Sequence, residues 1–102
     1  VILVLTTVPA DERGAAIART IVEERLAACV SALPPMTSIY RWQGAVTEDA
    51  ERQLIIKTVR ERLPALEQRL RVLHPYDIPE FLLIEVAGGS AAYLEWLIGN
   101  AE

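Results

Sequence analysis

The N-terminal run VILVLTTV, residues 1–8, constrains the fold more than any other segment because it is apolar or β-branched throughout. A run without polar alternation predicts a central strand covered on both faces, not an edge strand with a solvent side. Pro9 ends it, since proline cannot donate a ladder hydrogen bond. The run has no basic leader or cleavage site and is too short to cross a bilayer, so we expect neither a signal peptide nor a membrane anchor.

The next segments predict a helix and then a hairpin. A stripe of Ile17, Ala18, Ile21 and Val22 predicts a helix that starts near Asp11. Residues 29–35 become extended and end in a bend at two prolines. Residues 37–42 and 45–59 are strand-like and are joined by the polar pair Gln43–Gly44. We expect this hairpin to protrude past the core.

The second half of the chain predicts helix, strand and helix. Pro64 suits the first residue of a helix, and leucines at 63, 66, 70 and 73 form its apolar stripe. The helix should end at His74, residues 81–86 (FLLIEV) should form a strand, and Gly88–Gly89 should break it. Ser90 then caps a last helix with an apolar face that contains Tyr93, Leu94, Leu97 and Ile98.

This order of elements predicts one domain over residues 1–102, of the α+β class. It matches the ferredoxin-like βαββαβ plan, an antiparallel sheet with both main helices on one face, plus a C-terminal helix. The other face of such a sheet needs a cover, and the mean hydropathy of +0.25 indicates spare apolar surface. A closed symmetric oligomer would supply that cover.

Composition argues against several kinds of partner. The net charge is −4, and the 10 Lys and Arg residues are scattered among 14 acids. No basic face for nucleic acid is expected, and no membrane partner. Cys29 is the single cysteine, so neither an internal disulfide nor a zinc ribbon is possible. We therefore expect a cytoplasmic protein.

Three stretches carry a family resemblance: EERLAACVSALPPMTSIYRWQG from Glu23 to Gly44, LIIKT from Leu54 to Thr58, and LHPYDIPE from Leu73 to Glu80, followed by YLEWL at 93–97. Together, in this order and spacing, they resemble the CutA family, named for divalent-cation tolerance. The resemblance implies a ferredoxin-like subunit in a tight homotrimer, similar in shape to the PII signal-transduction proteins. It also implies a link to copper and other divalent ions, without an agreed reaction.

The resemblance suggests a metal site, with copper as the first candidate and no organic cofactor evident. Copper proposals for the family lean on cysteine, whereas this chain offers only Cys29, so histidine or carboxylates must complete any soft-metal site. We predict a site between subunits formed by Cys29, His74 and Glu80. Each residue has a plainer interpretation: His74 could cap its helix or bond a carbonyl, and Cys29 could be a small buried apolar residue.

Aromatic and charged residues extend the candidate cleft. Tyr40 and Trp42 share one strand face, which favours subunit packing over a stacking wall for a ligand. Lys57 lies within an apolar strand and should pair with a carboxylate, either Glu80 or one from a neighbouring subunit. The acids Glu48, Asp49 and Glu51 could gather a hard cation, but solvation is the simpler interpretation. The predicted cleft or interface residues are Tyr40, Trp42, Lys57, Tyr76 and Trp96.

The sequence predicts a binding protein and not an enzyme. It contains no Gly-rich phosphate loop, GxSxG or HExxH motif. The leading function is a trimeric CutA-like protein that binds or responds to divalent metal such as copper. The alternative is a PII-like small-molecule sensor or adaptor that uses the inter-subunit clefts. An acylphosphatase-type enzyme ranks last, because TTVPADER places proline where an anion-binding loop needs backbone donors.

Overall fold

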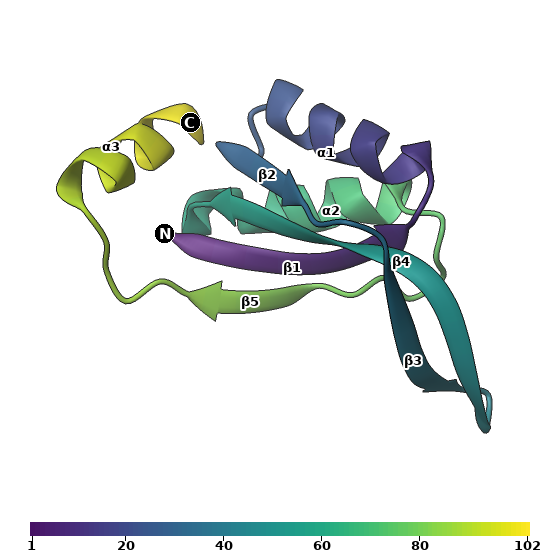
Figure 1. Cartoon of the computed structure of the whole chain (residues 1–102). Helices are drawn as coiled ribbons and strands as arrows, with labels where there is room; N and C mark the ends of the chain where they lie inside the picture. Colours follow the sequence, from purple (N-terminus) through teal and green to yellow (C-terminus); the bar gives the residue numbers. More distant parts are fainter.

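A computed structural model describes the whole chain, residues 1–102, as three helices and five strands (Figure 1). A single 3-10 turn, η1, precedes the second helix at Arg60–Arg62. The elements in chain order are β1 Ile2–Pro9, α1 Glu12–Glu23, β2 Cys29–Ala32, β3 Met36–Trp42, β4 Ala45–Thr58, α2 Leu63–Leu73, β5 Leu82–Glu85 and α3 Ala91–Asn100.

The sheet confirms the predicted α+β plan. Its strand order is β2-β4-β1-β5, every pair is antiparallel, and β3 pairs with the outer half of β4. The predicted bend at Pro34–Pro35 separates β2 from β3, so one strand of the simple plan becomes two. Figure 1 shows α1 and α2 on one side of the sheet, while α3 lies beyond its end. None of the helices is long and apolar enough to cross a membrane.

The core lies between the sheet and its two covering helices. The even-numbered residues of β1, and those of β4 from Leu54 to Thr58, face these helices, because side chains alternate along a strand. The leucine stripe of α2 is confirmed, since Leu66 and Leu70 are buried. In α1 the stripe is narrower than predicted, because Val22 is exposed. The buried apolar core comprises Ile2, Val4, Val8, Ile17, Ile21, Leu26, Ala27, Leu54, Ile56, Leu66 and Leu70.

The opposite side of the sheet, called the open face below, carries Leu3, Leu5 and Ile55 and has no covering layer of helices. These residues are only partly buried, and all four residues of β5 are exposed. The prediction that β1 is central is confirmed, because β4 and β5 flank it. The prediction that it is covered on both faces is wrong for one chain, since α1 and α2 share one face. The homotrimer stays a prediction.

The hairpin of β3 and the outer half of β4, residues 36–51, is called the arm. Gln43 and Gly44 form its two-residue turn with φ of 51° and 81°, the left-handed conformation of a hairpin turn that matches strand twist. Figure 1 shows the arm extending away from the sheet, as predicted. At its base, the guanidinium of Arg52 donates to the Leu33 carbonyl at 2.7 Å and so fixes the bend.

The helix ends follow the sequence signals. Asp11 caps α1 by accepting a hydrogen bond from the Arg13 backbone, and Ser90 accepts one from Tyr93 N at the start of α3. α2 begins at Leu63, one residue before Pro64, and ends at His74 as predicted. The predicted apolar face of α3 is mostly exposed, because only Leu97 on it is buried.

Candidate functional site

His74 connects the end of α2 to β1. Its ring Nε2 lies 2.8 Å from the Thr7 carbonyl oxygen, and its Nδ1 accepts the Tyr76 backbone N–H at 3.2 Å. A carbonyl only accepts and an N–H only donates, so Nε2 carries the proton and Nδ1 does not. The side chain is buried, and both nitrogens are occupied. The interpretation as a cap and carbonyl partner therefore describes His74 in this structure.

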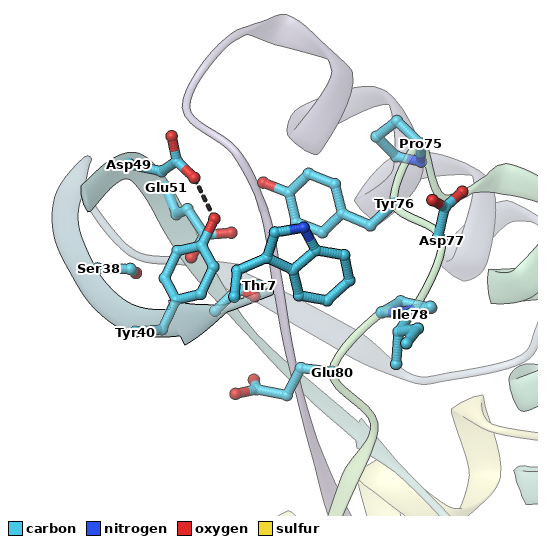
Figure 2. Close-up of a pocket in the computed structure, with 12 residues that line it drawn as sticks. Thr7, Ser38, Tyr40, Asp49, Glu51, Pro75, Tyr76, Asp77, Ile78 and Glu80 are labelled. Atoms are coloured by element: carbon cyan, nitrogen blue, oxygen red, sulfur yellow. Dashed lines mark hydrogen bonds between the residues drawn. The ribbon is translucent and has the colours of Figure 1, made fainter. Parts of the chain in front are cut away.

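A groove of about 640 Å³ lies between the arm and the loop of residues 75–80 that follows His74. Figure 2 shows Tyr40, Asp49 and Glu51 on the arm side and Tyr76 on the loop side. We call it the acidic groove, because four of its lining residues are carboxylates and none is basic. It is lined by Thr7, Ser38, Tyr40, Trp42, Asp49, Glu51, Pro75, Tyr76, Asp77, Ile78, Pro79 and Glu80.

Two tyrosines in the groove face carboxylates. The Tyr40 hydroxyl donates to Asp49, and this hydrogen bond raises the pKa of the phenol. Glu51 is only 8% exposed. Burial, followed by the neighbouring Glu51 carboxylate, raises the pKa of Tyr76 well above its ordinary value. Both phenols therefore stay protonated at neutral pH and can donate hydrogen bonds.

The raised pKa of Tyr76 predicts a loss of stability in alkali. Unfolded tyrosine ionises near pH 10, whereas folded Tyr76 resists ionisation, so its contribution is complete below pH 10 and is lost as pH rises further. Urea unfolding between about pH 9 and about pH 11 should show a steeper loss of stability for the parent than for Tyr76→Phe. Parallel losses in the two proteins would contradict this assignment.

Glu80 and Lys57 lie apart, which corrects the predicted pairing. Glu80 accepts a hydrogen bond from Gln53 Nε2 at 3.0 Å, at the same end of β1 as His74. Lys57 Nζ instead donates to the Tyr93 hydroxyl at 3.1 Å, with its ammonium 5.4 Å from that ring's centre. Trp96 packs on Tyr93 at a ring distance of 5.6 Å. Lys57 thus joins the aromatic side chains of α3 and has no carboxylate partner in the chain.

Cys29 also lies away from the acidic groove. It is partly exposed, not buried as favoured from the sequence, and it lies in one row of the sheet with Lys57 and Leu3. Thr7, which holds His74, lies four positions farther along β1, a separation of roughly 13 Å at the usual rise per strand residue. One chain therefore does not bring Cys29 together with His74 and Glu80, and it contains no cluster of three His, Cys, Asp or Glu residues suited to a metal ion.

The sequence favours solvation for the acids Glu48, Asp49 and Glu51; this is wrong for Glu51, which is only 8% exposed, whereas Asp49 is exposed as expected. Both belong to β4 and face the groove, opposite Ser38 and Met36 of β3. The signal was present in the turn: a two-residue connection at Gln43–Gly44 pairs Trp42 with Ala45 and fixes every later pair. Counting outward from this turn would have put Asp49 on the same face as Tyr40.

Comparison with known proteins places the chain in a family. The model of the CutA1 divalent ion tolerance protein matches residues 2–100. The divalent-cation tolerance protein CutA of Thermus thermophilus is 50% identical over 98 residues, which are 96% of this chain and 95% of that protein. The chloroplastic protein CutA of Arabidopsis thaliana is 46% identical over 94% of this chain, which spans 53% of that protein's length.

Solved structures agree with this assignment. The PII-like protein CutA from Nostoc sp. PCC 7120, solved in apo form, superimposes with a TM-score of 0.93 at 38% identity, covering 100% of this chain and 98% of that one. The sheet order, the arm and the three helices described above are therefore those of a known fold. The chain belongs to the CutA1 divalent ion tolerance family.

Proposed function

We propose that the chain works as a cytoplasmic homotrimer that binds or responds to divalent metal ions, copper first among them, and that it catalyses no reaction. The acidic groove is the observation that carries this proposal. It gathers four carboxylates without a basic side chain, and such a surface attracts cations. The names of the relatives, divalent ion tolerance proteins, point to the same ligand class.

The homotrimer rests on the open face. Leu82 and Ile84 of β5 are 54% and 44% exposed, and they continue the apolar rows of Leu5 and Leu3 across the sheet. Lys57 lies in the same row as Leu3, but the exposed apolar side chains beside it form a surface of the kind that interfaces between chains bury. The family resemblance implies an assembly of three subunits, and a symmetric ring of three would cover every open face equally.

A metal site in this proposal takes ligands from more than one chain. One chain supplies Glu80 and the neighbouring acids of the groove, and a second would complete the coordination. Oxygen ligands suit hard divalent ions, whereas copper prefers nitrogen or sulfur, so Cys29 of an adjacent chain is the natural soft ligand. His74 could join only by giving up its bond to Thr7.

Calorimetry with Cu(II) tests the proposal. Glu80→Gln, which keeps the size and removes the charge, should weaken binding by about tenfold, because a charged ligand is lost. Cys29→Ala should weaken binding of copper more than binding of Mg²⁺, since only copper favours sulfur. His74→Ala should still bind copper when folded, because this site does not use the His74 ring, and any loss of affinity should be smaller than in Glu80→Gln. Parent-like copper binding by both Glu80→Gln and Cys29→Ala would contradict the site.

A second candidate function is a PII-like small-molecule sensor or adaptor. The groove volume of about 640 Å³ favours it, because binding sites for organic ligands typically measure roughly 300–1,000 Å³ and have aromatic walls. A bare metal ion would leave most of this space empty. The structural relative from Nostoc is itself described as PII-like.

A further inference from the structure

The charge of the acidic groove is not balanced within the chain. Asp49, Glu51, Asp77 and Glu80 line it, and none of them takes part in an ion pair. Two arginines on neighbouring segments are engaged elsewhere, since Arg13 pairs with Asp11 and Arg52 donates to carbonyl oxygens at the base of the arm. Arg41 of the arm is not among the residues that line the groove. Like charges that line one groove repel one another, so the groove favours a positively charged occupant.

Glu51 is the buried one of the four acidic residues that line the groove. Its side chain lies on β4 and points into the groove beside Tyr40 and Tyr76 (Figure 2), and it is more than nine-tenths buried. Its carboxylate opens onto the groove, where the Tyr76 hydroxyl is a neighbouring donor. The phenols that face it are neutral and no lining residue is basic, so a cation that enters the groove meets a carboxylate that is not neutralised by an ion pair.

The walls around these carboxylates favour an organic cation over an inorganic one. Tyr40, Trp42 and Tyr76 present aromatic rings to the groove, and the faces of such rings attract ammonium groups. Ile78 and the two prolines of the loop add apolar surface that can pack on methylene groups. Both walls carry carboxylates: Asp49 and Glu51 on the arm, and Asp77 and Glu80 on the loop. A ligand with a positive charge at each end could therefore pair with one wall at each end.

We propose that the acidic groove binds an aliphatic diamine or polyamine. Its ammonium groups would donate to the carboxylates of the two walls, and its methylene chain would lie against the aromatic rings. The proposal rests on the second function given above, the small-molecule sensor, and names the class of its ligand. Anionic ligands are excluded from the groove by the same four carboxylates.

Calorimetry tests the proposal by comparing the binding of 1,4-diaminobutane with that of 1,4-butanediol, which has the same chain length but no charge. The chain of residues 1–102 should bind the diamine and not the diol, and added salt should weaken binding of the diamine. Glu51→Gln should reduce diamine affinity by about tenfold or more, because a buried charged hydrogen bond becomes neutral. Glu48→Gln is the matched control: it makes the same change on the same strand, at an exposed position outside the groove.

Three results would overturn the proposal: equal binding of diol and diamine, equal affinity in the parent and Glu51→Gln, or no diamine binding by protein that circular dichroism shows to be folded. Asp49→Asn provides a second test at an exposed position, where a folding defect is not expected. Copper titrations on the same samples separate the two proposals. Copper binding without diamine binding would remove this inference and leave the metal function intact.

Discussion

Ile55→Asp is expected to stop the chain from self-associating, so that light scattering gives the 11.3 kDa mass of one chain instead of three times that value. Ile55 lies on the open face, in a row that runs from Ser31 through Leu5 to Leu82. A carboxylate introduced there would be buried without a partner in each copy of the assembly. Desolvating that carboxylate costs several kcal/mol per ion, which exceeds the stabilisation that the association gains from one apolar side chain.

Val72→Asp is the matched control, because it places the same charge on α2 at a residue that is 71% exposed. This variant should keep the parent's mass. If Ile55→Asp also kept that mass, the open face would not be the interface between chains. If the parent protein itself had the mass of a single chain, the proposed trimer would be wrong. The proposed metal site, which takes ligands from a second chain, would then be wrong as well.

The order of the elements could be predicted because each one carries a local signal. Pro9 ends β1, Asp11 and Ser90 cap helices, and Gln43–Gly44 forms a two-residue turn. These signals act over a few residues, so they survive in any tertiary context. The burial of β1 was harder to predict, because its unbroken apolar run indicates cover on both faces, whereas the helices of the chain cover only one.

The acidic groove could be predicted only in part, because it joins segments that are distant in the sequence. Tyr40, Tyr76 and Glu80 were assigned to one cleft from the motifs that contain them, and the structure brings these three together. Asp49 and Glu51 were missed because consecutive acids resemble a solvated loop until the strand register is counted. The pairing of Lys57 with Glu80 was wrong, because its Tyr93 partner lies on a helix whose position no local pattern determines. The place of Lys57 at an interface between chains stays a prediction.

His74 accounts for how the loop wall of the groove is held in place. β5 pairs with β1 only from Ile2 to Leu5, so the following residues of β1 have no strand partner on that side. The His74 ring donates to the Thr7 carbonyl there and accepts the Tyr76 N–H at the same time. One side chain thus couples the sheet, the end of α2 and the loop that carries Tyr76. The histidine that first suggested a metal ligand is a structural element of the neighbouring groove.

His74→Ala is therefore expected to lower the free energy of unfolding by about 3 kcal/mol, because two backbone groups lose their partners and a buried ring is removed. The contact between the His74 and Tyr76 rings, at 4.7 Å, is lost as well. Urea unfolding of parent and variant at one fixed protein concentration measures the change, since the stability of an oligomer depends on concentration. The loop should also loosen, so diamine affinity should fall together with stability.

Two further variants separate the halves of this role. In His74→Gln the amide N–H can take the place of Nε2 and donate to the Thr7 carbonyl, whereas in His74→Asn the amide oxygen can take the place of Nδ1 and accept the Tyr76 N–H. Each should recover part of the lost stability, and neither should recover all of it. A metal ligand would behave differently: its loss would leave apo-protein stability near that of the parent and would abolish copper binding. That pattern in His74→Ala would return His74 to the metal site and contradict its structural role.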